Sequence, residues 1–417
     1  MNRECALIIT LAVAVRLVLF FAFPSLPEVL VNRVEISTPV TSFKRLQEGL
    51  FLYRHGISPY DGGVFHQAPL LLAFFTTLQS SDIAFKLVYI AADVLSALSL
   101  IQIANSGVAA SSALYTSTRK DMQWPSWRVA AVFLLNPFTV ATCISRSTIV
   151  FTNTVVLLAI SKAVGKKPAA ASMALAMASY LSLYPALIVP PTLLLSYDCL
   201  PSNKKPASIS KFLAVQTITY LGALGGLMGL SFLITDGSWE FLRSTYGVHL
   251  LLPDLTPNVG LWWYFFIEMF DSFREFFLCT FQLHLLIYVG GVTIRLRRQP
   301  LFAIITLLGI TATFKSYPSI GDMSVYFGLL SLYRHIFPLM RYTFFTISTL
   351  LYASLLGPAF YYLWIYAGSG NANFFYAITL VWSLANTLLI VDTLFALLRD
   401  EWETERPEMK GKFVVQI

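Results

Sequence analysis

Two asparagines, Asn371 and Asn373, stand two positions apart in the segment 368–373, which reads Gly-Ser-Gly-Asn-Ala-Asn. A carboxamide both donates and accepts hydrogen bonds, so a pair at this spacing suits phosphate oxygens and sugar hydroxyls. Glycine, serine and asparagine also favour turns by themselves, which offers a purely structural interpretation. From the residues alone, the segment is either a simple turn or a turn that binds a polar headgroup.

A second candidate is the double-proline segment 253–258, Pro-Asp-Leu-Thr-Pro-Asn, which leads into the aromatic run 262–266. Asp254 can accept from a sugar hydroxyl or an amine, and Asn258 closes the same loop. Trp262 can stack on the face of a sugar. The structural alternatives are an Asx-type helix cap for Asp254 and an aromatic anchor at the membrane interface for Trp262.

Three lysines, Lys204, Lys205 and Lys211, cluster just before a long apolar stretch. A basic pocket in such a place can bind the headgroup of an anionic phospholipid. Positive-inside topology alone explains the same charges equally well.

Residues for covalent or metal chemistry are harder to find. The chain has no Gly-x-Ser-x-Gly nucleophile elbow and no cysteine with an obvious histidine partner. Its four cysteines lack metal-ligand spacing, and His55 and His66 have no third ligand within reach in the sequence. We therefore expect no catalytic residue, no metal and no cofactor.

The composition indicates that the elements that position the candidate residues lie in a membrane. Of the 417 residues, 56 % are hydrophobic and 12 % are charged, the latter about half the fraction usual in soluble domains. A soluble globule of this composition would expose large apolar patches, whereas a bilayer solvates them. The net charge of +7 is scattered in short clusters between apolar runs, a pattern typical of loops beside anionic lipid and not of a nucleic-acid groove.

The apolar runs predict an all-α polytopic membrane protein with about twelve spans. A span needs roughly 20 apolar residues. The candidate ranges are 5–23, 83–104, 128–143, 147–163, 168–180, 182–198, 212–234, 273–294, 300–314, 322–338, 342–366 and 375–398. The first is read as a retained span and not as a cleaved signal peptide, because Arg16 lies inside it and no small-residue cleavage site follows.

Basic loop residues then predict the orientation. With a cytosolic N-terminus, almost every Lys and Arg cluster falls on the cytosolic side, and the C-terminus is cytosolic too. The opposite side receives the segments 24–82, 235–272, 315–322 and 368–373. We thus expect one membrane domain, 1–398, followed by a flexible cytosolic tail, 399–417. The charged residues Arg16, Asp93 and Arg146 are expected either to hold helices together or to line a cavity.

Six long segments carry a resemblance to a known family. They are FKRLQEGLFLYRHGISPYDGGVFHQAPLLL at 43–72, SRSTIVFTNT at 145–154, ASYLSLYPALIVPP at 178–191, VHLLLPDLTPNVGLWWYFFIEMF at 248–270, FKSYPSIGD at 314–322 and LWIYAGSGNANFFYAITL at 363–380. These segments are similar to the PIG-U family, the polytopic subunit of the transamidase that attaches glycosylphosphatidylinositol (GPI) to protein C-termini. The resemblance covers nearly the whole chain.

The resemblance implies a non-catalytic subunit in the endoplasmic reticulum membrane. Such a subunit binds the GPI lipid and presents the anchor to a Cys-His protease subunit, PIG-K. The attachment signal of the precursor is a second candidate ligand. PIG-T, PIG-S and a Gaa-type GPI attachment subunit are the other implied partners, with membrane phospholipids around the bundle and no nucleic acid. Asn371 and Asn373 match the asparagine pair of the family, which we take to contact the GPI headgroup.

A broader resemblance is to GT-C glycosyltransferases, carried by HGISPYDGGVFHQAPLLL at 55–72, and it implies a GT-C-like bundle. The alternative function is thus a lumenal mannosyltransferase that uses dolichol-phosphate-mannose. Metal-assisted sugar transfer favours two adjacent carboxylates, and none of Glu28, Glu35, Glu48 and Asp61 forms a close pair in the sequence. A transporter is disfavoured because no inverted repeat is visible.

Overall fold

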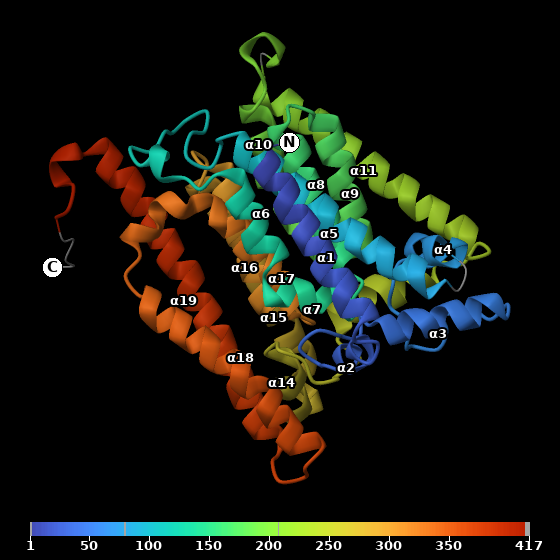
Figure 1. The fold of residues 1–417 in the computed structure, drawn as a ribbon. Helices are drawn as coiled ribbons and strands as arrows, with labels where there is room; N and C mark the ends of the chain where they lie inside the picture. Colours follow the sequence, from blue (N-terminus) through green and yellow to red (C-terminus); the bar gives the residue numbers. More distant parts are fainter. Residues whose placement is uncertain (1, 79–80, 207, 413–417) are drawn as a thin grey trace.

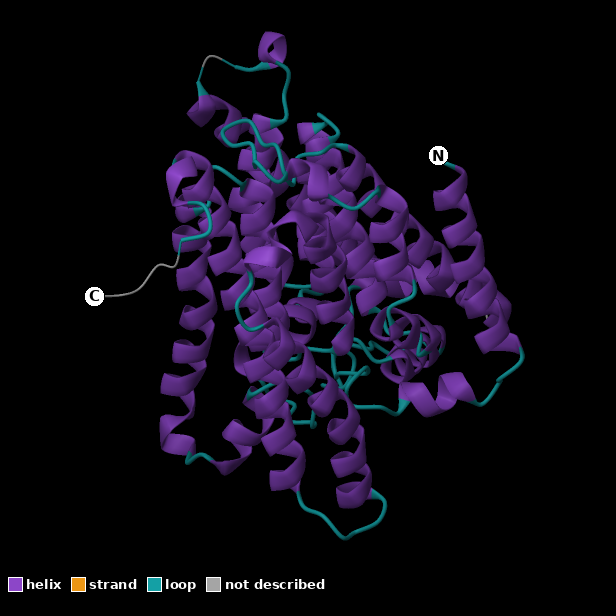
Figure 2. Cartoon of the chain, turned by 60° about the vertical axis from the view of Figure 1, so that its left-hand side comes forward, coloured by secondary structure: helices purple, strands orange, loops and turns teal. Residues whose placement is uncertain are grey.

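The computed structural model describes residues 2–78, 81–206 and 208–412, and within these ranges it forms helices and no strand longer than one isolated bridge (Figures 1 and 2). The α-helices are α1 Arg3–Phe21, α2 Leu26–Val31, α3 Phe43–Arg54, α4 Pro69–Thr77, α5 Asp82–Asn105, α6 Ser126–Leu134, α7 Pro137–Ile144, α8 Ile149–Val164, α9 Pro168–Leu181, α10 Val189–Asp198, α11 Ile209–Ile234, α12 Glu240–Leu242, α13 Val248–Leu251, α14 Trp262–Glu268, α15 Asp271–Arg295, α16 Pro300–Phe314, α17 Ile320–Leu330, α18 Thr343–Ile365 and α19 Ala372–Glu405. Short helical turns are η1 Lys120–Met122, η2 Tyr184–Ile188, η3 Ser202–Lys204, η4 Arg243–Gly247, η5 Ser331–Leu339 and η6 Pro407–Met409.

The all-α membrane fold is confirmed, but the count of about twelve spans is not. Each of the twelve predicted ranges holds a helix or consecutive helices. Among the described residues, however, only six helices are long and apolar enough to cross a membrane: α1, α5, α11, α15, α18 and α19. The bent pair of α6 and α7 makes a seventh if it is one span.

Proline and helix length explain why the other apolar runs are not full spans. The Asn136 side-chain oxygen caps α7 by accepting a hydrogen bond from the Phe138 amide, and Pro137 occupies the first helical position. Because α7 starts anew at this point, the α6–α7 pair bends by 53°. Helix α16 has 15 residues, about 22 Å of helix, against a hydrocarbon layer of about 30 Å.

The core lies around α16, which is buried on every side against α10, α15, α17 and α19. Helices α5, α8 and α9 complete this core with small side chains such as Ala97, Ala159 and Ala176. In contrast, α11, α15 and α18 bury few residues and expose apolar side chains. Such helices are stable only if lipid or another subunit covers them.

One buried ion pair joins α1 to α5. The Arg16 guanidinium contacts Asp93 Oδ2 at 2.7 Å, and both side chains are almost fully buried. Charges in such a setting persist when they are paired. Of the two roles expected for these charges, the structure shows the first for Arg16 and Asp93, because their ion pair joins α1 to α5.

The four segments 24–82, 235–272, 315–322 and 368–373 gather at one end of the bundle, which we call the loop layer (Figure 1). Side-chain hydrogen bonds join them: Arg45 to Asp254, Ser244 to the Tyr60 carbonyl, Tyr317 to the Asp254 carbonyl, and Tyr264 to Asn373. The basic loops predicted on the other side meet at the opposite end, which we call the basic end.

At the basic end, α19 runs on to Glu405, so the predicted boundary at 398 falls inside this helix. Asp400 and Glu403 are buried and pair with Arg119. Residues 399–405 are thus the last turns of a packed helix and not a flexible tail. The final predicted tail residues, 413–417, lie outside the described residues.

Candidate functional site

The α18–α19 hairpin carries the asparagine pair at its tip (Figure 1). Asn371 is the N-cap of α19, and its Oδ1 accepts from the Phe374 amide at 3.2 Å. Asn373 Oδ1 accepts a hydrogen bond from the Tyr264 hydroxyl. Both residues are exposed, and no described residue accepts a hydrogen bond from either Nδ2 group. The structure is therefore compatible with both a structural turn and a headgroup-binding turn. The carboxamide oxygens accept hydrogen bonds within the protein, and the NH₂ groups remain available as donors.

An apolar groove of about 220 Å³, partly open to the surface, begins at Phe375, two residues after Asn373. Its apolar lining comes from six parts of the chain: Leu30 and Ile36, Phe138, Val259, Ile320, Ala353 with Gly357 and Pro358, and Phe375 with Ile378 and Trp382. The hydroxyls of Ser354 and Thr379 also line it, but each donates to a carbonyl of its own helix. The middle of the groove is consequently suited to hydrocarbon.

The charged groups of the groove are Arg33 and Glu35, which form an ion pair at 2.7 Å. The Arg33 guanidinium also lies 5.6 Å from the centre of the Tyr361 ring, on the last turns of α18. Because both side chains are partly exposed, a ligand can reach them. The sequence alone did not identify Arg33 as a candidate, because a single arginine in a loop matches no motif. Only the tertiary structure places it at the groove.

Asp254 lies inside the loop layer and its carboxylate is already engaged. Oδ2 contacts Arg45 at 2.5 Å, and Oδ1 accepts from the Thr256 amide at 2.9 Å. Burial opposes ionisation, but these hydrogen bonds outweigh it and lower the pKa of Asp254. The Asp254 carboxylate therefore stabilises its own turn and links this loop to Arg45 on α3.

Asn258 and Trp262 face the protein interior. Asn258 is fully buried, and its Oδ1 accepts from the Gly260 amide at 2.8 Å. The Trp262 indole is also buried and donates to the Phe314 carbonyl at 2.8 Å. The structure does not bring these two side chains together with Asn371 and Asn373 on one surface.

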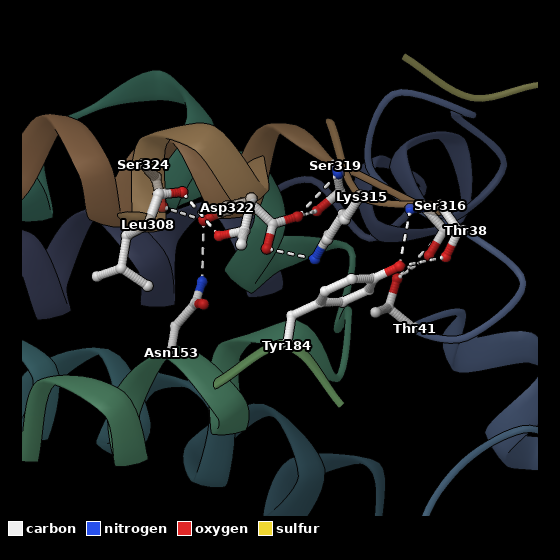
Figure 3. Close-up of polar contacts among 12 residues, drawn as sticks. Thr38, Thr41, Asn153, Tyr184, Leu308, Lys315, Ser316, Ser319, Asp322 and Ser324 are labelled. Atoms are coloured by element: carbon white, nitrogen blue, oxygen red, sulfur yellow. Dashed lines mark hydrogen bonds and ion pairs between the residues drawn. The ribbon is translucent and has the colours of Figure 1, made fainter. Parts of the chain in front are cut away.

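A polar chamber lies behind the loop layer, around Lys315 (Figure 3). The Lys315 ammonium contacts Asp322 at 2.6 Å, and Tyr184 and Ser316 hydrogen-bond beside them at 3.0 Å. Asn153 reaches in from α8 to the Gly321 carbonyl. His249 lines the adjoining space, and burial lowers its pKa to about 3, assisted by the Lys315 and His66 charges.

The carboxylates of the first long loop remain apart from one another. Glu35 pairs with Arg33, while Asp61 lies beside Glu240 from a later segment and accepts from Ser58 at 2.9 Å. The contact with Glu240 lowers the pKa of Asp61 and raises the pKa of Glu240. No group of three His, Cys, Asp or Glu residues able to hold a metal occurs within the described ranges.

Lys204, Lys205 and Lys211 lie at the basic end, in and after the loop that joins α10 to α11. Lys204 and Lys211 are exposed, and the Lys205 ammonium lies 5.2 Å from the centre of the Tyr197 ring. The α10–α11 loop lies at the end of the bundle opposite the loop layer (Figure 1).

These features define a class: an all-helical membrane protein with a side-opening apolar groove that ends in polar groups. The family model described as GPI transamidase subunit PIG-U matches residues 10–382. The chain is 37 % identical over 420 residues to the human "GPI-anchor transamidase component PIGU", covering 96 % of this chain and 95 % of that protein. It is 36 % identical over 406 residues to the "GPI transamidase component GAB1" of Saccharomyces cerevisiae, with 97 % of each chain covered. The chain therefore belongs to the PIG-U family of GPI transamidase subunits.

Proposed function

We propose that this chain binds the GPI lipid anchor at the groove between α18, α19 and the segment 30–36, and holds it for attachment to protein C-termini. The groove supports this assignment because its apolar walls and its polar end match the two halves of a glycolipid. Phe375, in the groove wall, is two residues from Asn373, a rise of about 3 Å along α19.

The headgroup contacts in this proposal come from Asn371, Asn373 and Arg33. The free NH₂ donors of the asparagines suit phosphate and sugar oxygens, and a guanidinium suits a phosphate. Asp254, Asn258 and Trp262 belong to the binding region in a supporting role, since their polar atoms already hydrogen-bond within the loop layer.

The chain acts by positioning and not by bond chemistry in this proposal. Holding the terminal amine of the anchor near an acyl-enzyme on another subunit lowers the entropic barrier to transfer. The partners would be a PIG-K protease subunit, PIG-T, PIG-S and a Gaa-type subunit, in the endoplasmic reticulum membrane with both termini cytosolic. The exposed apolar faces of α11, α15 and α18 suit such subunits or lipid.

Lys204, Lys205 and Lys211 are proposed to contact anionic phospholipid headgroups on the cytosolic face. Exposed ammonium groups next to an apolar helix are attracted to such a surface by about 1 kcal/mol each.

Lipid analysis of cells that lack the gene tests the proposal. We expect complete GPI, with all its mannoses and its terminal ethanolamine phosphate, to accumulate while precursor proteins stay unanchored. An under-mannosylated precursor would instead indicate the mannosyltransferase alternative. In that case Glu28, Glu35, Glu48 and Asp61 should be replaced one at a time, because loss of mannose transfer would identify the catalytic carboxylate.

A further inference from the structure

A pocket of about 400 Å³ lies in the loop layer and shares no lining residue with the α18–α19 groove. Leu50, Phe51 and Phe85 form its apolar part. Its polar part consists of Gln47, Arg54, His55, Asp82 and Arg146, which come from α3, the start of α5 and the turn between α7 and α8. Its volume is in the range of small-molecule sites, roughly 300–1,000 Å³.

Arg146 has a backbone conformation that a non-glycine residue rarely adopts, with a φ of +58°. Such a conformation is strained for a residue with a Cβ atom, and glycine would adopt it without strain. Hydrogen bonds on both sides hold the turn, from the Arg146 amide to the Cys143 carbonyl and from the Thr148 amide to the Thr41 carbonyl. An arginine at a strained position indicates that its side chain is needed there.

The Arg146 guanidinium is held in a defined place. It lies 4.1 Å from the centre of the Phe43 ring, and Nη1 contacts Asp82 at 2.9 Å. Its Nε is buried and has no hydrogen-bond partner among the described residues. The stacking on Phe43 and the ion pair with Asp82 thus orient the planar Arg146 guanidinium, which still has an N–H group free to donate a hydrogen bond.

Two arginines, Arg54 and Arg146, line the pocket. Among its described lining residues Asp82 is the one carboxylate, and it also pairs with Lys86 at 2.5 Å. His55 Nδ1 is hydrogen-bonded to the Phe51 carbonyl at 2.8 Å, which fixes the orientation of the imidazole ring. Guanidinium groups recognise phosphate oxygens through parallel hydrogen bonds.

We propose that this pocket binds a phosphate ester, separately from the groove and independently of the function proposed above. The lining residue Phe51 is exposed, and α5, which supplies Asp82 and Phe85 to the pocket, also exposes the apolar side chains Ile83 and Leu87. The ester can therefore be part of a membrane lipid or of a soluble compound. Both sources share the phosphate that Arg146 and Arg54 would contact.

Calorimetric titration of the full-length chain in an uncharged detergent tests this site. The probes are dihexanoyl phosphatidic acid, glycerol 3-phosphate and, as the ligand without phosphate, dihexanoyl glycerol. We expect Arg146→Gln to weaken phosphate-ester binding at least about tenfold, as for loss of a charge-assisted contact, and Arg146→Lys to restore part of it. Lys120→Gln, which removes one exposed cation at the basic end, is the matched control and should bind like the wild type.

Arg146→Gly separates binding from folding. Glycine accepts the positive φ, so its melting temperature should stay near that of the wild type while binding is lost. If the Arg146 variants unfold, Arg54→Gln on the α3 wall decides, because it should also weaken binding. Tighter binding of phosphatidic acid than of glycerol 3-phosphate identifies a lipid source, and equal binding a soluble one. The proposal is overturned if the wild type binds neither ester, or if the folded Arg146 and Arg54 variants bind as the wild type does.

Discussion

The two asparagines at the tip of the α18–α19 hairpin have divided roles. Each uses its carboxamide oxygen inside the protein, Asn371 on the Phe374 amide and Asn373 on the Tyr264 hydroxyl. A substitution that removes the whole carboxamide therefore changes both the turn and the surface, whereas aspartate keeps the accepting oxygen and removes only the donor.

Aspartate at both positions should therefore weaken GPI transfer without unfolding the chain. We expect the Asn371→Asp, Asn373→Asp double variant to reduce GPI attachment about tenfold or more, because two donors are replaced by charges that repel phosphate. Surface display of a GPI-anchored reporter in gene-deleted cells measures the effect. Asn105→Asp, at an exposed position at the end of α5, is the control. Normal display by the double variant would argue against the headgroup contact.

His249 makes the stability of the chain depend on pH. Its folded-state pKa of about 3 lies below the usual value near 6.5, so the folded state binds fewer protons than the unfolded state between these values. Stability must then fall as the pH drops below about 6.5. Lys315 and His66, the charged or titratable groups facing it, act in the same direction.

Between pH 7 and pH 5 the loss from His249 alone is about 2 kcal/mol. We expect His249→Asn, which cannot be protonated in this range, to flatten the pH dependence of the melting temperature in detergent. A slope identical to that of the wild type would show that His249 does not titrate on unfolding.

At the scale of the helices, the proposed lipid site depends on the space beside α18. A Cβ atom at Gly357 would meet only Ile378, at 3.9 Å, so alanine fits there without displacing a neighbour. A longer side chain at the same position would extend toward the groove that Gly357 lines.

Gly357→Leu should block the groove and Gly357→Ala should not. We expect the leucine variant to lower GPI attachment at least about tenfold because bound hydrocarbon and the new side chain compete for one volume. The alanine variant should keep activity and gain up to about 1 kcal/mol of helix stability. Co-purification with the other transamidase subunits should be equal for both. Full activity of the leucine variant would place the lipid elsewhere.

The positions of the helices were largely predictable from the sequence, because every predicted span range contains a helix. The number of membrane spans was not predictable. Apolar content marks a segment as excluded from water, but it does not distinguish lipid from the interior of the bundle. Helix α16 is the clearest case, because it is as apolar as a span yet is buried by its neighbours. The same ambiguity made η5 and α17 resemble one span.

Across the whole molecule, the two ends differ in how they are held together. The segments of the loop layer are joined by several side-chain hydrogen bonds to backbone carbonyls and by the Arg45–Asp254 ion pair. At the basic end, ion pairs connect α19 to loops far away in the sequence. Arg119 contacts both Asp400 and Glu403, and the Tyr115 hydroxyl donates to Asp400 at 2.7 Å.

Loss of the Asp400 charge should destabilise the entire basic end. We expect Asp400→Asn to cost on the order of 2 kcal/mol, because Arg119 loses one of its two carboxylate partners while Glu403 still pairs with it. Thermal unfolding in detergent measures this effect. Glu408→Gln, at an exposed position beyond α19, is the control and should change little. An unchanged melting temperature for Asp400→Asn would mean that the ion pairs are dispensable.

The sequence by itself determined the membrane class, the helix-forming ranges, the family and the asparagine pair. Hydropathy, turn chemistry and motif similarity are properties of short segments, so they can be read without a fold. The same local signals selected Asn258 and Trp262, but local chemistry cannot tell an outward side chain from a buried one.

Only the tertiary structure decided which residues share a surface. It paired Arg16 with Asp93, brought Asp61 beside Glu240, and placed Arg33 over Tyr361 in the lining of a groove built from six separate segments. Such juxtapositions depend on how helices far apart in the chain pack against one another. Packing satisfies the burial of all side chains at once, and no single segment contains that information.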